Sequence, residues 1–280
     1  MKSQKNLESK VAELVQRLPP MPGNISRLLL AANDPRQDDG ALLALARQDP
    51  GLCADLLHLA NTFCSRRGGH DETLEEAVSS VGMQPLVQLI GVWYAKDVIT
   101  TEFAPLKHLN DYFRHSQEIS VGCRVLSEVA GMPERRREVF SVAGLIHDMG
   151  RLVIMLAADR TTAPLMGTPW NEMEAIVHEE RQVLGMDHCK VGMQICKKWN
   201  FSAFLQQGVL RHHCPLIDND FNLLGATIFI AHFVTFSDFT GEMLSSLLPG
   251  EILDRLNLEP ADFEQARLEY LSRVPKSSDS

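Results

Sequence analysis

Histidines dominate the chemistry that this sequence could support. Seven of its ten histidines lie beyond residue 110, several of them in otherwise apolar segments: His115, His147, His178, His188, His212, His213 and His232. Neutral imidazoles and carboxylates are the ligands that borderline divalent metals prefer, and a helical bundle can present them inward from facing helices. The pattern indicates a metal site. Any one of these histidines, taken alone, is more simply interpreted as a hydrogen-bonded core or surface residue.

Two candidate ligands, His147 and Asp148, are neighbours in the chain. Side chains of adjacent helical residues point about 100° apart, so this pair alone does not define a ligand set. The segment after Pro133 reads as one helix that carries His147, Asp148 and Arg151 among apolar residues. A helix that is apolar nearly all round is expected to be central, and its polar side chains then need partners or a purpose.

The elements that must position these side chains are predicted to be helices. Apolar residues recur at helical spacing along almost the whole chain, whereas the alternation typical of half-buried strands is scarce. The sequence therefore predicts an all-α fold, a two-lobed helical bundle. The expected helices cover residues 7–18, 24–33, 39–48, 50 onward, 74–81, 83–99, 111–130, 134 onward, 170–184, 187–199, 202–213, 222–236 and 260–274, with a loop over 161–169 and disorder over 277–280.

Prolines and the spacing of the segments suggest how the chain divides. Pro19 and Pro20 end the first helix, because proline lacks the amide hydrogen that a continuing helix needs. We divide the chain into an N-terminal helical lobe over residues 1–104, a second helical lobe with the histidines and Asp148 over 105–240, and a C-terminal helical tail over 241–280.

Composition narrows the class of protein. The net charge of −9 repels nucleic-acid phosphates and anionic lipid surfaces, so neither nucleic acid nor membrane is an expected partner. The longest apolar runs, such as 223–236, fall short of the roughly 20 residues of a membrane span, and the N-terminus does not read as a signal peptide. The six cysteines form no Cys-x-x-Cys pair, which argues against a zinc ribbon or redox dithiol. Reduced thiols in the cytoplasm are expected.

Several spaced segments resemble one family. Two of them, Phe113-Arg114-His115-Ser116 and the run from Gly144 to Arg151 with its His147-Asp148 pair, are similar to the first histidine and the His-Asp pair of HD-domain metallophosphohydrolases. Other segments resemble those of the HDOD family, the HD-related output domain. They are Leu18-Pro19-Pro20-Met21-Pro22, 48–52, 56–61, 74–78 with Gly82, His178-Glu179-Glu180, 185–188, Val191-Gly192 and 211–215. The resemblance extends over roughly residues 18–236 and makes the second lobe HD-like.

The resemblance implies a set of site residues. The implied metal ligands are His115, His147, Asp148, His188, His212 and His213, and Arg151 stands where those enzymes place a basic residue that can meet a phosphate oxygen. The last HD-domain ligand, an aspartate, is replaced here by His232, which can still bind a metal but lowers the negative charge of the site. Cys214-Pro215 replaces the glycine-tyrosine-proline signature of cyclic-dinucleotide phosphodiesterases, which disfavours that activity. Cys189, Cys196 and Cys214 lie near the histidines in the sequence and are additional candidate thiolate ligands.

Two functions are compatible with this pattern. The first is a bacterial HDOD signalling module that couples a cytoplasmic signal to a partner protein without catalysis of its own. The second is a metal-dependent phosphohydrolase in which Asp148 and Arg151 are catalytic and a phosphate-bearing small molecule is the substrate. One or two divalent transition-metal ions would fit either, and a histidine-rich shell favours iron, manganese, zinc or nickel over magnesium or calcium. A metal-free polar cluster that only ties helices together is the remaining alternative.

Overall fold

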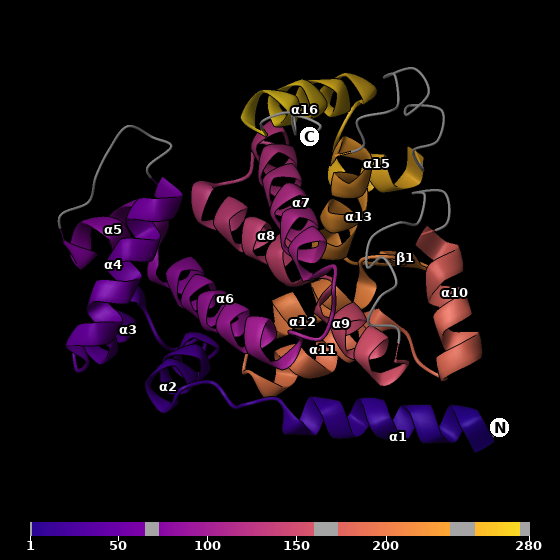
Figure 1. The fold of residues 1–280 in the computed structure, drawn as a ribbon. Helices are drawn as coiled ribbons and strands as arrows, with labels where there is room; N and C mark the ends of the chain where they lie inside the picture. Colours follow the sequence, from indigo (N-terminus) through magenta and orange to yellow (C-terminus); the bar gives the residue numbers. More distant parts are fainter. Residues whose placement is uncertain (1, 65–72, 160–172, 236–249, 275–280) are drawn as a thin grey trace.

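The computed structural model describes residues 2–64, 73–159, 173–235 and 250–274 and confirms an all-α fold (Figure 1). The N-terminal helices are α1 (Lys2–Arg17), α2 (Gly23–Ala32), α3 (Asp39–Ala46), α4 (Pro50–Cys64), α5 (Leu74–Val81) and α6 (Met83–Glu102). The elements that follow are α7 (Leu109–Val129), α8 (Glu134–Ile146), α9 (Met149–Ala157), α10 (Met173–Leu184), α11 (His188–Lys198), α12 (Ala203–Arg211), β1 (Leu216–Ile217), β2 (Asp220–Phe221), α13 (Leu223–Thr235), α15 (Gly250–Leu256) and α16 (Pro260–Arg273).

The observed helices differ from the expected ones at three places. The predicted helix through His147, Asp148 and Arg151 is wrong as a single element, because α8 ends at Ile146 and α9 begins at Met149. A hairpin of two two-residue strands, β1 and β2, was not expected, since strands this short show no alternation. Helix α15 was also not expected. The predicted loop over 161–169 and the predicted disorder over 277–280 lie outside the described residues.

Helix α7 packs against α8, α13 and α16; in Figure 1 α8 lies to its left, α13 to its right and α16 across its upper end. Buried apolar residues of the N-terminal and C-terminal helices belong to one continuous hydrophobic core. The division into lobes at residue 104 remains a prediction.

The N-terminal helices are attached to the turn between α11 and α12. The indole Nε1 of Trp199, a residue only 1% exposed, donates to the carbonyl of Pro19 at 2.9 Å. The side chain of Asn200 donates to Ser26 Oγ at 2.9 Å, and Lys198 Nζ donates to the carbonyl of Gln16 at 2.8 Å. Because α11 and α12 also carry histidines of the candidate site, these bonds connect the N-terminal helices to the scaffold of that site.

Two glycines set how closely the central helices approach each other. A Cβ atom on Gly144 would lie 2.6 Å from the Cα of Ser120 in α7. A Cβ on Gly150 would lie 2.6 Å from the backbone nitrogen of Gly192 in α11, and closer still to the carbonyl oxygen of His188. Both distances are shorter than atoms can tolerate, so only glycine allows these backbone contacts. The two contacts flank the His147-Asp148 pair and hold α7 and α11 on either side of it.

One stretch of the described chain, Glu134–Ala157, is long and apolar enough to cross a membrane by composition alone. The prediction that every apolar run falls short of a membrane span was wrong for this stretch. It comprises α8 and α9, and 72% of its most apolar window is buried inside the protein, as in the core helices of many folds.

Candidate metal centre

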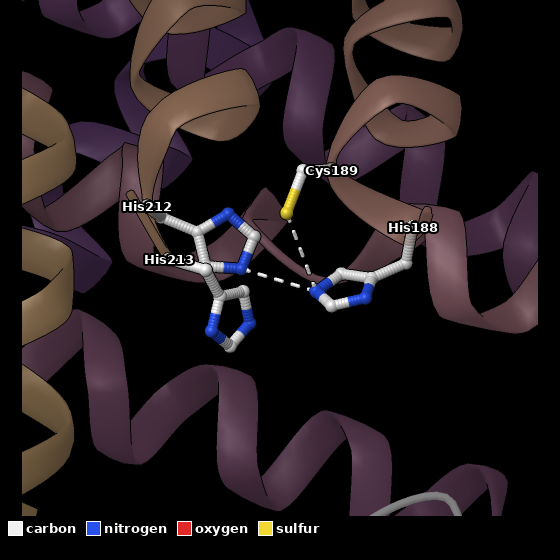
Figure 2. Close-up of side chains that lie close together, drawn as sticks. All are labelled: His188, Cys189, His212 and His213. Atoms are coloured by element: carbon white, nitrogen blue, oxygen red, sulfur yellow. Dashed lines mark hydrogen bonds between the residues drawn. The ribbon is translucent and has the colours of Figure 1, made fainter. Parts of the chain in front are cut away.

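The residues implied as ligands converge from five parts of the chain. His115 lies on α7, His147 and Asp148 lie between α8 and α9, and His232 lies on α13. His188 begins α11, and His212 and His213 follow α12. Their donor atoms form overlapping groups in which the atoms lie within 4.8 Å of one another. We call His115, His147 and His232 the His115 group, and His188, Cys189, His212 and His213 the His188 group (Figure 2).

The break between α8 and α9 lets two adjacent residues reach the same centre. Asp148 adopts φ −100° and ψ 10°, outside the α-helical geometry of its neighbours. As a result His147 Nε2 and Asp148 Oδ2 lie 3.5 Å apart, although side chains of neighbours on a continuous helix diverge by about 100°. The turn after the break is closed by a hydrogen bond from the Arg151 amide to the Asp148 carbonyl at 2.9 Å.

The Asp148 carboxylate stands between the two groups. Its Oδ2 faces the His115 group, 3.5 Å from His147 Nε2 and 3.9 Å from His115 Nε2. Its Oδ1 faces the His188 group, 3.3 Å from His188 Nε2 and 3.5 Å from His212 Nε2. A carboxylate in this position can donate one oxygen to each of two cations.

Four of the imidazoles are held with the same nitrogen facing inward. The Nδ1 atoms of His147, His212 and His232 lie 2.8, 2.6 and 2.8 Å from the backbone carbonyls of residues 144, 209 and 228. A carbonyl only accepts hydrogen bonds, so each Nδ1 carries a proton. When such a ring is neutral, its Nε2 therefore keeps the lone pair that can bind a metal. His188 Nδ1 is held in the same way by Glu180 Oε2 at 2.7 Å. Metal-binding histidines are oriented by this kind of partner.

Several inward-facing atoms have no other partner. Among the described residues, His115 Nε2, His147 Nε2 and His213 Nδ1 are buried without a hydrogen bond. A buried polar atom without a partner costs about 1–3 kcal/mol, so a cluster of them is unfavourable unless something else satisfies it. Oriented nitrogens, a carboxylate between them and unpaired donor atoms together fit a divalent metal ion.

The centre is enclosed. Among its residues, His147, His188 and His212 are 0% exposed, and His232 is the most exposed of the remaining buried members at 7%. The side chains of His115 and Arg151 reach the surface more than the others, at 17% and 14%. The Arg151 guanidinium lies 3.6 Å from Asp148 Oδ2, so it lies on the Oδ2 side of the carboxylate.

Burial and charge divide the histidines into two classes. Burial lowers the pKa of His147 and His213 well below the usual value, that of His115 to about 4 and that of His232 to about 3. These four rings are therefore neutral near pH 7, the form that binds metal.

The other two rings carry charge in the metal-free protein. Burial opposes protonation of His188 and His212, but the nearby Cys189 thiolate raises the pKa of His188 well above its usual value and that of His212 to about 9. Burial would raise the pKa of Asp148, but His147 and His212 hold it well below its usual range. The carboxylate is thus an anion, and it balances part of the imidazole charge.

Three residues near the predicted set have roles that the motifs did not resolve. His178 is exposed, its Nε2 pairs with Gln182, and it does not join the centre. Glu180 was quoted only as part of a motif, yet it accepts both the backbone amide and the ring Nδ1 of His188. A carboxylate eight residues before a candidate ligand gives no spacing signal, because this contact is made across the turn between α10 and α11. Cys189 enters the His188 group.

The Glu180 contact gives a testable prediction. In Glu180→Gln, the acceptor that fixes His188 loses its charge, so we expect about 10–100-fold weaker metal binding, the usual cost of removing such an orienting partner. Isothermal titration of the metal-free protein with Zn²⁺ measures it. The exposed neighbour Glu179→Gln is the control and should bind as the unmodified chain does. Equal affinities in the two variants would show that Glu180 does not orient a ligand.

Comparison with known proteins identifies the family. A family model of the HDOD domain matches residues 18–215. The chain belongs to the HDOD family. An uncharacterized protein of Treponema pallidum (strain Nichols) is 23% identical to this HDOD chain over 261 residues, which is 90% of the chain and 48% of that protein. The chain therefore spans about half the length of the curated relative that it matches.

Solved structures share the fold of this HDOD chain. A protein from Shewanella amazonensis named as a candidate phosphohydrolase has a TM-score of 0.64 at 20% identity, with 94% of each chain covered. An HDOD domain protein of unknown function from Geobacter sulfurreducens has a TM-score of 0.62 at 20% identity, with 98% of each covered. A candidate signal transduction protein from Marinobacter aquaeolei has a TM-score of 0.65 at 15% identity, covering 97% of this chain and 64% of that one.

Proposed function

We propose that this chain is a cytoplasmic HDOD signalling module of bacterial type that holds divalent transition metal in its His/Asp centre and acts on a partner protein rather than on a phosphate ester. The observation that carries the proposal is the enclosed set of oriented imidazoles around Asp148. Such a set is suited to bind an ion, and its members are buried.

The position of Asp148 supports two ions rather than one. Each carboxylate oxygen faces a separate group of imidazoles, so one ion could be held in each group, with Asp148 offering one oxygen to each. Iron, manganese, zinc and nickel are the metals that this donor set suits. Bound metal would join α7, α8, α11, α12 and α13, so its presence or loss would change the stability of the whole second half of the module.

Metal removal tests the proposal. We expect about one to two ions per chain by elemental analysis of the protein as isolated, by analogy with the two donor groups. At a metal concentration of about 100 times Kd, binding stabilises the fold by about 2.7 kcal/mol. For each ion removed, dialysis against a chelator should thus lower Tm by about 5–10 °C, given about 2–4 °C per kcal/mol for a large domain. Adding metal back should restore it.

The control for this experiment is His178→Ala, which removes a histidine outside the centre and should leave metal content and the Tm shift unchanged. A chain that is isolated without metal, takes up none and keeps its Tm in chelator would refute the metal-binding function and leave a polar cluster that only ties helices together.

A phosphohydrolase is the second candidate, and Arg151 favours it. Its guanidinium is the cationic group that lies beside Asp148 and also reaches the surface, so it could contact a phosphate from outside. The chemistry that a divalent ion supplies in such a site is activation of water and neutralisation of phosphate charge.

The two candidates differ in turnover: the metal-loaded module should release no phosphate from phosphomonoesters, nucleotides or cyclic dinucleotides. Turnover that Arg151→Ala and Asp148→Ala both abolish would establish the enzyme instead.

A further inference from the structure

The His188 group contains a thiol among its imidazoles. Cys189 is 2% exposed, and its donor atom lies within 4.8 Å of those of His188, His212 and His213. Figure 2 shows its sulfur pointing toward the rings of His188 and His212, in the space between α11 and the end of α12. Resting on the metal-binding function proposed above, we propose that Cys189 is a metal ligand, so that the His188 group is a mixed thiolate and imidazole site for a thiophilic ion, with Zn²⁺ as the best fit.

The distances between donor atoms fit a tetrahedral zinc site. With Zn–N of about 2.0–2.1 Å and Zn–S of about 2.3 Å, tetrahedral geometry places two nitrogens about 3.3 Å apart and a nitrogen and a sulfur about 3.6 Å apart. His188 Nε2 and His212 Nε2 lie 3.3 Å apart, and Cys189 Sγ lies 3.6 Å from His188 Nε2. His213, whose donor atom lies within 4.8 Å of the other three, makes a set of four donors, and Asp148 Oδ1 stands beside them, 3.3 Å from His188 Nε2.

The start of α11 fixes the thiol in place. Asp187 caps the helix by accepting the Lys190 amide at 2.8 Å, and Glu180 accepts the His188 amide at 2.8 Å. Cys189 is the second residue of this restrained turn, so its sulfur does not have to reorganise to reach a cation. Preorganised donors of this kind lose little freedom when an ion binds.

The remaining described cysteines show that this arrangement is specific. Cys196 lies on the same helix, two turns farther on, and is fully buried, yet it belongs to no cluster of metal-binding side chains among the described residues. Cys123 is equally buried and also stands outside such a cluster. Burial alone therefore does not account for the position of Cys189 beside three imidazoles.

A thiolate would alter both the charge and the selectivity of the centre. With His232 a neutral donor, Asp148 and Cys189 are the anionic donor atoms that face the ions. A thiolate is soft, so it favours zinc and other thiophilic ions and disfavours manganese and magnesium, which prefer oxygen. The His115 group contains only imidazoles, with Asp148 Oδ2 beside it, and has no such preference for sulfur-binding ions.

Cobalt spectroscopy tests the proposal on the full chain. After chelator treatment the chain is titrated with Co²⁺, and a thiolate ligand gives charge-transfer absorption in the near ultraviolet. We expect this band in the unmodified chain and in Cys196→Ala, and its loss in both Cys189→Ser and Cys189→Ala. The Zn²⁺ affinity of the His188 group should fall by more than about tenfold in Cys189→Ser. Loss of a partner that only orients a ligand already costs at least about tenfold, and loss of the ligand itself should cost more. Visible cobalt bands from the His115 group should persist and report that the variants remain folded.

The outcomes separate this inference from the proposed function. Stoichiometric Co²⁺ binding without the ultraviolet band, or a band that survives in Cys189→Ser, would show that the thiol only hydrogen-bonds His188 and would leave the metal-binding module intact. A chain that binds no Co²⁺ by equilibrium dialysis would overturn both.

Discussion

Asp148→Asn should weaken metal binding severely. Replacing a carboxylate by an amide keeps the shape of the side chain but removes the negative charge that faces both the His115 and the His188 groups. Loss of an orienting partner costs about 10–100-fold in metal affinity, and loss of a directly contacting anion costs more, so we expect a fall of more than about 100-fold. Elemental analysis and Zn²⁺ titration of the variant measure it.

The same substitution should also destabilise the metal-free protein. Asp148 is 2% exposed, and it balances imidazole charge as well as the guanidinium of Arg151 at 3.6 Å. Removing one partner of a buried ion pair costs about 3–5 kcal/mol, because the remaining charge is left without compensation. Asp254→Asn is the matched control, since it makes the same chemical change at an exposed position of α15. If Asp148→Asn bound metal as tightly as that control, the carboxylate would not be a ligand and the model of two bridged ions would be wrong.

Gly150→Ala is expected to be the most destabilising single-methyl change in the described part of the chain. The added Cβ would overlap the carbonyl oxygen of His188 and lie 2.6 Å from the nitrogen of Gly192, and both are backbone atoms that cannot rotate away. Overpacking of a core costs about 1–3 kcal/mol and sometimes more. Because α9 and α11 must here move apart, we expect a loss of at least about 3 kcal/mol, at the upper end of that range. Denaturant unfolding of the chelator-treated chain measures it.

The separation of α9 from α11 should reach the metal centre as well. Asp148 immediately precedes α9 and His188 begins α11, so moving the helices apart lengthens the 3.3 Å distance between Asp148 Oδ1 and His188 Nε2. Gly23→Ala is the control, because a Cβ there meets no atom within 4 Å. It should change the free energy of unfolding by less than about 1 kcal/mol. A stable, metal-binding Gly150→Ala variant would show that this helix crossing is not what positions the ligands.

The stretch around His147 shows what helical periodicity can predict and what it cannot. Apolar spacing correctly indicated a central, buried helical segment, since burial demands such a pattern wherever the backbone is helical. The same pattern hid the break at His147 and Asp148, because apolar residues continue at helical spacing into α9. The break is what brings two adjacent side chains to one centre, so an interpretation based on a continuous helix undervalued the pair.

For the histidines, the sequence was more informative than the helical periodicity was for the break at His147. Their order along the chain, compared with the HD-domain pattern, pointed to His115, His147, His188, His212 and His213, which the fold brings together, and not to His178, which is exposed. That they bind metal stays a prediction. His232 seemed to depart from the pattern, yet it joins the His115 group through α13, with ring centroids 5.0 Å from those of His147 and 5.2 Å from those of His115. No spacing rule predicted the contact of Glu180 with His188.

The helical class, the family and the candidate site residues could be predicted from the sequence, because these depend on local periodicity and on motifs that are contiguous in the chain. Only the tertiary structure decided which oxygen of Asp148 faces which imidazoles, that Cys189 stands among them, and that Glu180 orients His188. The close approach of α8 to α7 at Gly144 and of α9 to α11 at Gly150 is part of the packing that sets these relations. Distances between helices distant in sequence follow from packing, which no local pattern encodes.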